Sequence, residues 1–96
     1  MVPKFNGIGE LVCPSCGSEY LHHHKVEVFE RKEDATQGLH VTVTKDSAAI
    51  DNVLDGNPSA RRHGLSVHFW CEGCKAEPVL SIGQHKGNTN VTFKLR

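Results

Sequence analysis

Two Cys-x-x-Cys pairs constrain the fold of this chain more than any other feature of its sequence. Cys13 and Cys16 form the first pair, and Cys71 and Cys74 form the second. A Cys-x-x-Cys turn directs two thiols to the same side, so two such turns supply the four ligands of one tetrahedral metal ion. The spacing therefore predicts that opposite ends of the polypeptide meet at a metal centre.

The residues around the two pairs differ. In the first turn, Pro14 presets the backbone, and Gly17 can adopt the positive φ that folds backbone N–H groups toward the sulfurs. The second turn holds Gly73 between its cysteines, and Lys75 stands where the first has its trailing glycine. We expect Lys75 to offset part of the negative charge of the thiolates.

The stretch 13–20, CPSCGSEY, resembles a rubredoxin-type zinc knuckle, and the two pairs together resemble the zinc-ribbon class. Small proteins of this class occur in bacteria and their viruses. The resemblance covers the knuckles and the strands beside them, and it implies one structural Zn²⁺ bound by all four thiolates. Two alternatives remain: an iron centre in a rubredoxin-like electron carrier, and disulfides.

Four thiolates leave no open coordination position for an activated water, which disfavours a catalytic zinc. The chain also lacks a nucleophile elbow, a phosphate-binding glycine loop and a pair of catalytic carboxylates. We therefore do not expect an enzyme. With 96 residues and 38% hydrophobic residues, we expect a single domain over 1–96 whose thin core needs the metal for stability.

Five segments show the composition or alternation of β-strands. They are residues 20–31, 39–44, 65–70, 79–84 and 90–95. The last two flank a short glycine-containing connection of hairpin length. We expect a mainly β zinc ribbon, with a small antiparallel sheet of about five strands.

Residues 45–64 form the one long stretch without a strand pattern. Asp46 or Ser47 could cap a short helix over 48–54, and the sequence DGNP at 55–58 predicts a turn. We interpret the segment as an inserted loop or short helix. It either faces a partner or only covers a sheet edge.

Eleven basic and eleven acidic residues give zero net charge, which argues against indiscriminate nucleic-acid binding. No apolar run is long enough to cross a bilayer, and the N-terminus does not resemble a signal peptide. We expect a soluble, cytoplasmic chain without a membrane partner. In a reducing compartment, paired cysteines hold metal more often than they form disulfides.

Several polar and aromatic residues are candidates for binding. His22, His23 and His24 are interpreted as exposed or strand-packing side chains, with target contact or metal binding as alternatives; His68 and His85 are interpreted similarly. Trp70 directly precedes Cys71, so we expect its indole to cover the metal turn, with a stacking platform as the alternative. A basic face could form if the 45–64 segment folds toward the last hairpin; its members would be Arg61, Arg62, Lys86, Lys94 and Arg96. Solvated surface charge is the favoured interpretation of these residues.

These observations favour a binding module stabilised by structural zinc. Its expected partner is a protein or macromolecular complex, approached through the 45–64 segment and an edge strand. A nucleic-acid-binding ribbon that uses Arg61, Arg62, Lys86, Lys94 and Trp70 is the alternative, and an iron electron carrier is the third. An unpaired edge strand could also pair across a two-fold axis, although the pattern does not demand it.

Overall fold

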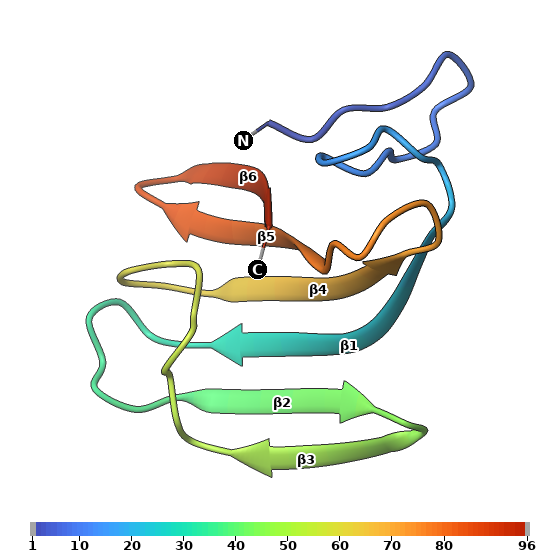
Figure 1. The fold of residues 1–96 in the computed structure, drawn as a ribbon. Coiled ribbons are helices and arrows are strands. Elements are labelled where there is room, and N and C mark those ends of the chain that lie inside the picture. Colours follow the sequence, from blue (N-terminus) through green and yellow to red (C-terminus); the bar gives the residue numbers. More distant parts are fainter. Residues whose placement is uncertain (1, 96) are drawn as a thin grey trace.

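Six β-strands form one open antiparallel sheet in the computed structural model, which describes residues 2–95 (Figure 1). The strands are β1 (Leu21–Glu30), β2 (Leu39–Thr44), β3 (Ser47–Asp51), β4 (Gly64–Cys71), β5 (Pro78–His85) and β6 (Asn88–Leu95). Their order across the sheet is β3-β2-β1-β4-β5-β6. No helix of the described residues is long and apolar enough to span a membrane.

The mainly β prediction is confirmed, and each of the five predicted strands forms within two residues of its expected ends. Two tight turns set the hairpins. Lys86 and Gly87 (φ 50° and 81°) connect β5 to β6, as the sequence predicted for that connection. Lys45 and Asp46 (φ 50° and 63°) connect β2 to β3 in the same left-handed conformation, which matches the twist of paired strands.

The prediction of a loop or short helix after residue 44 is wrong for its first part. Ser47–Asp51 forms β3, a strand in addition to the five predicted, and Ala49 pairs with Thr42 of β2. No helix forms among the described residues of this segment. A helix this short is marginal in water by itself, whereas the free edge of β2 offers the backbone a complete set of hydrogen-bond partners. The predicted turn does form: the N–H of Asn57 bonds to the carbonyl of Leu54 (3.1 Å).

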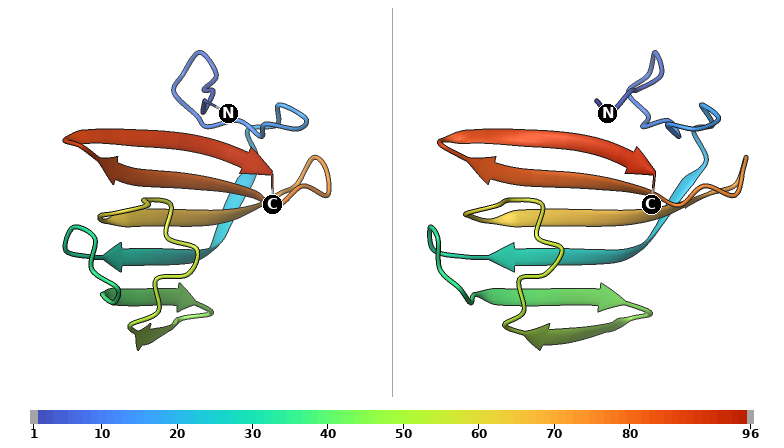
Figure 2. Two further views of the ribbon diagram at one scale, coloured as in Figure 1. Left: turned by 90° about the vertical axis from the view of Figure 1, so that its left-hand side faces the viewer. Right: turned by 60° about the vertical axis from the view of Figure 1, so that its left-hand side comes forward.

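Residues 52–63, which we call the cover segment, run from the end of β3 to the start of β4 across one face of the sheet (Figures 1 and 2). Gly64 and Gly83 are direct cross-strand partners on that face. A Cβ on Gly64 would lie 2.8 Å from Pro58, and one on Gly83 would lie 3.0 Å from the Pro58 carbonyl oxygen. The two glycines therefore let the cover segment lie flat on the sheet.

The two faces of the sheet differ in polarity. The face under the cover segment, the polar face, carries Ser66, Ser81 and His40 among its residues. The opposite, apolar face carries two rows of apolar side chains that cross every strand, as the pairing register requires. The first row is Ile50, Val41, Val28, Leu65, Ile82 and Val91. The second row is Ala48, Val43, Val26, Val67, Leu80 and Phe93.

A chain of hydrogen bonds on the polar face joins the strands β3, β2, β1 and β4. Asp51 contacts His40 (Oδ1 to Nδ1, 2.9 Å), and His40 contacts Glu27 (Nε2 to Oε2, 2.9 Å). The other oxygen of Glu27 contacts His68 Nε2 at 2.8 Å. Glu27 and both histidines are largely buried. Each member of the chain thus holds its neighbouring strand in register.

The charges of the hydrogen-bonded residues Asp51, His40 and Glu27 stabilise one another. Burial opposes the charged imidazolium of His40, but Asp51 and Glu27 outweigh burial and raise the pKa of His40 above 6.5. Burial likewise raises the pKa of Glu27, but the two histidines and nearby Lys25 outweigh it and hold this pKa below 4.5. Between pH 4.5 and 6.5, His40 is therefore protonated and Glu27 ionised, so the ion pair between them is complete.

We predict that Glu27→Gln lowers the free energy of unfolding by about 2 kcal/mol near pH 6, because hydrogen bonds to a charged partner are lost in a buried place. The contribution of His40 is full below pH 6.5 and is lost as the pH rises through its raised folded-state pKa. The difference between wild type and variant should therefore shrink as the pH rises above about 6.5. Urea unfolding of both proteins at each pH measures this difference.

Glu30→Gln is the matched control, since Glu30 lies on the same strand but is exposed. We expect the control to remain within about 0.5 kcal/mol of wild type. A pH-independent loss in Glu27→Gln would contradict the proposed charge linkage.

Candidate metal centre

Two turns from opposite ends of the chain meet to bring four cysteines together as a candidate metal centre. The first, at 13–17, follows a short N-terminal hairpin in which Phe5 pairs with Leu11. The second begins at Cys71, the last residue of β4. Leu21, the first residue of β1, pairs with Cys71, and the N–H of Glu72 bonds to the carbonyl of Tyr20 (3.0 Å). The β1–β4 pairing therefore brings the two turns together.

The four sulfur atoms lie within 4.8 Å of one another. Cys13 Sγ is 3.8 Å from Cys74 Sγ, and Cys16 Sγ is 3.6 Å from Cys71 Sγ. Zn–S bonds of about 2.3 Å in a tetrahedron place sulfurs about 3.8 Å apart. The four thiols are free rather than paired as disulfides, and their spacing suits one tetrahedral ion.

Backbone N–H groups point at the sulfurs in both turns. Ser15 donates to Cys13 Sγ at 3.4 Å, Gly73 to Cys71 Sγ at 3.3 Å and Ala76 to Cys74 Sγ at 3.4 Å. Gly17 has the positive φ of 79° that the sequence predicted. Such N–H groups stabilise thiolate charge and orient the ligands.

The thiols influence one another strongly. Burial raises the pKa of Cys13, but backbone N–H groups of Cys16 and Ser15 and the neighbouring thiols outweigh it and lower this pKa to about 7. The N–H of Ser18 lowers the pKa of Cys16, but the other three cysteines raise it to about 12. The cluster thus accepts a first negative charge easily and resists the next. A divalent cation would remove that repulsion.

Gly73 explains why the second turn departs from the pattern of the first. A Cβ at this position would lie 3.2 Å from Cys16 Sγ and 3.0 Å from Ser18 Cβ. These distances are tighter than ordinary contacts, so the first turn would have to move. Glycine is needed here because the turns press against each other. Lys75 is exposed, and whether it offsets thiolate charge stays a prediction.

The histidines lie outside the cysteine cluster, which is the only such group of metal-ligating side chains among residues 2–95. A β-bulge lies between His23 and Lys25. His24 therefore does not continue the regular alternation with His22. His68 belongs to the hydrogen-bonded chain on the polar face, and His85 pairs with Asn88 at the β5–β6 turn.

The expectation that Trp70 covers the metal turn is wrong. Its side chain is 45% exposed and stacks on His22, with ring centroids 4.4 Å apart. Adjacent residues of a strand point to opposite faces, so Trp70 and Cys71 cannot share one. His22 also pairs with Glu72. The result is an exposed aromatic pair beside the metal centre.

The basic residues named as binding candidates lie in different places. Arg61 contacts Asp34 (2.6 and 2.8 Å) and Glu33 (3.0 Å), and Arg62 contacts Glu33 (2.7 Å). Lys86 and Lys94 stand at opposite ends of the β5–β6 hairpin, about 25 Å apart at the rise of a strand. Arg96 lies outside the described residues.

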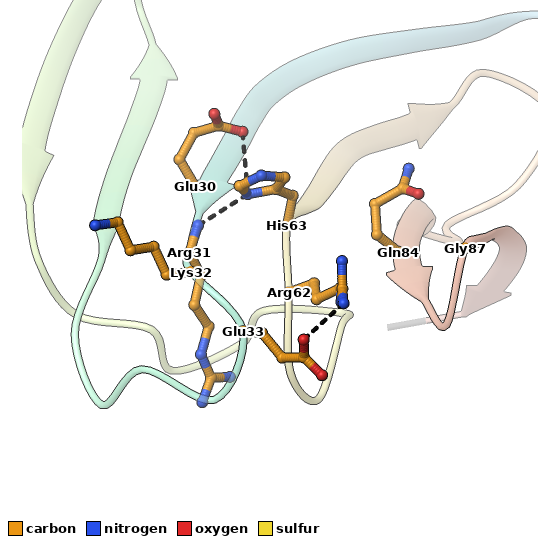
Figure 3. Close-up of a pocket in the computed structure, with 8 residues that line it drawn as sticks. All are labelled: Glu30, Arg31, Lys32, Glu33, Arg62, His63, Gln84 and Gly87. Carbon is orange, nitrogen blue, oxygen red and sulfur yellow. Dashed lines mark hydrogen bonds and ion pairs between the residues drawn. The ribbon is translucent and has the colours of Figure 1, made fainter.

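The 45–64 segment does approach the last hairpin, as the basic-face prediction required. The hydroxyl of Ser59 donates to the carbonyl of Gln84 (2.7 Å). Arg62 lines a depression of about 610 Å³ together with Gln84 and Gly87 (Figure 3). Its guanidinium there is paired with Glu33, so Arg62 brings no unpaired positive charge to the depression.

Comparisons with protein-family models, curated proteins and solved structures find no match to this chain.

We predict that Gly73→Ala weakens metal binding about 10-fold, because an added methyl group in this close contact forces the two turns apart at about 1 kcal/mol or more. Competition with a chromophoric chelator measures the affinity. Gly7→Ala is the control, since a Cβ on Gly7 meets nothing within 4 Å. Equal metal affinities for the two variants would contradict the prediction, because the contact between the turns would then tolerate an added methyl group.

Proposed function

We propose that this chain is a binding module stabilised by structural zinc, and that its partner is a protein. The observation that carries the proposal is the spacing of the four cysteine sulfurs, which suits one tetrahedral ion. Zinc is the metal we propose because four thiolates saturate its preferred coordination. The proposed role is structural, since a saturated ion has no position for substrate or water.

The edge strand β3 is the surface we propose for the partner. In a two-residue hairpin, the residues that flank the turn form a hydrogen-bonded pair, here Thr44 and Ser47. The N–H and C=O groups of Ala48 and Ile50 then face away from β2. All five residues of β3 are exposed. An extended peptide could therefore add to this edge as a further strand.

Nucleic-acid binding is the second candidate, and the stacked pair of Trp70 and His22 favours it. Exposed aromatic rings can stack on nucleobases. The charge distribution argues against this candidate, because Arg61 and Arg62 are engaged by acidic side chains. An iron electron carrier is the third candidate and uses the same four ligands.

We predict that freshly purified protein contains about one zinc per chain and that a strong chelator abolishes its β-sheet circular dichroism. Structural zinc sites contribute on the order of 10 kcal/mol or more, which exceeds the stability of most small domains. Elemental analysis and far-ultraviolet spectra measure both effects. A coloured, iron-containing sample would support the electron carrier instead, and a chelated chain that keeps its sheet would contradict a structural role.

We predict that Ala48→Pro reduces capture of the protein partner from the native cell at least 10-fold, because proline removes an outward N–H from the β3 edge. Thr89→Pro is the matched control. Thr89 is the first residue after the hydrogen-bonded pair at the β5–β6 turn, so it occupies the equivalent position on the other edge strand. The captured proteins are quantified by mass spectrometry.

Equal loss in both proline variants would contradict a specific role for β3. Oligonucleotide binding that weakens steeply with salt and disappears in Trp70→Ala would favour the nucleic-acid candidate instead. The metal content of each variant is measured first, so that failure to fold is distinguished from failure to bind.

A further inference from the structure

The burial of the two sheet faces is the reverse of what their polarity would predict. On β4 and β5, the polar-face residues Ser66 and Ser81 are only 5% and 6% exposed. Their apolar neighbours Leu65 and Ile82 are less buried than these serines. The cover segment shields the polar face. The larger hydrophobic surface of the sheet is left facing outward.

Exposure is greatest toward the two ends of the first apolar row. Ile50 is 70% exposed on β3 and Val91 is 41% exposed on β6, while Val43 in the second row is 44% exposed. The β6 end of the second row is covered, since Phe93 is 1% exposed and shares a groove with Val12 of the N-terminal segment. Contiguous apolar surface of this kind marks an interaction site in soluble proteins.

The chain exposes more surface than a compact monomer of its mass would. A folded monomer of this mass exposes about 5,500 Å², whereas this chain exposes 6261 Å². Its radius of gyration is 14.1 Å, compared with about 12.5 Å for a compact chain of 96 residues. This surplus over the whole chain, on the order of 800 Å², is comparable with the share that one partner contributes to a standard protein interface.

The chemistry of the face permits contact with a second copy of itself. The two apolar rows contain no charged side chain; Glu30 and His23 lie beyond them, near the ends of β1. A two-fold interface brings the same patch against itself, so a central charge would face its own copy and oppose association. Small β domains usually bury such a face against a second layer, and this chain has only one sheet among its described residues.

We propose that two copies of the chain pack apolar face to apolar face as a β-sandwich dimer. The sheets would lie about 10 Å apart, with strands of the two copies within about 30° of each other. The edge of β3 would stay open for a partner, so the dimer does not depend on the protein-partner proposal. It requires only the folded, metal-loaded chain.

Sedimentation velocity of the full zinc-loaded chain, over micromolar to near-millimolar concentrations, tests the proposal. The expected species has twice the 10.6 kDa mass of the chain. Ile50→Lys with Val91→Lys should raise the dimer dissociation constant at least about 100-fold, because like charges then face each other across the interface. The control is Ala49→Lys with Thr92→Lys, the neighbouring positions on the same strands but on the polar face. It should dimerise as wild type does.

A second measurement needs no variant. In a dimer mixed from labelled and unlabelled wild-type chains, isotope-filtered nuclear Overhauser effects should connect methyl groups of Val41, Leu65 and Ile82 between copies. A wild-type chain that stays monomeric at every concentration overturns the proposal. A chain that stays monomeric and binds phosphatidylcholine vesicles overturns it as well. A dimer that lacks these Overhauser effects also overturns the proposal. A dimer that the double-lysine variant and its double-lysine control weaken equally overturns it too. Metal content and partner capture are separate readouts, so either proposal can fail alone.

Discussion

The convergence of four thiols is the constraint on which the rest of the molecule depends. The paired sulfurs come from residues 55 and 61 positions apart in the chain. Closing loops of this length costs conformational entropy in the unfolded chain, and the thiolates repel one another until a cation joins them. Metal binding and folding are therefore expected to be one event. A bound ion would also hold the start of β1 beside the end of β4, in the middle of the sheet.

The sheet is a single layer with an unusual distribution of buried side chains. Its covered face holds a hydrogen-bonded chain from Asp51 through His40 and Glu27 to His68. Its open face holds most of the large aliphatic side chains. The polar chain sets the register of four strands, while Phe29, stacked on His40, is one of few large side chains that are fully buried. A metal and a second copy would each supply stability that this thin core lacks.

Most of the architecture was predictable because it rests on local patterns. Period-two alternation located five strands, and cysteine spacing identified the four sulfurs that meet. Strand β3 was not predicted because Ala48 and Ala49 favour a helix locally. Pairing with the free edge of β2 makes them a strand. Trp70 was misplaced because its neighbour Cys71 suggested a shared position, whereas a strand turns adjacent side chains to opposite faces. The partners of Arg61 and Arg62 carried no sequence signal, since Glu33 and Asp34 lie 27 to 29 positions away.

Composition and spacing alone thus decide that this is a small β protein with a four-cysteine centre, because those features depend on residues that are neighbours or fixed steps apart. Strand order, the course of the cover segment and the buried polar chain depend on which distant strands pair. Only the tertiary structure decides that Gly64 lies opposite Gly83 and that a side chain at position 73 would meet Cys16. The same pairing decides which face of the sheet stays open, since the alternating pattern marks an apolar face without saying what covers it.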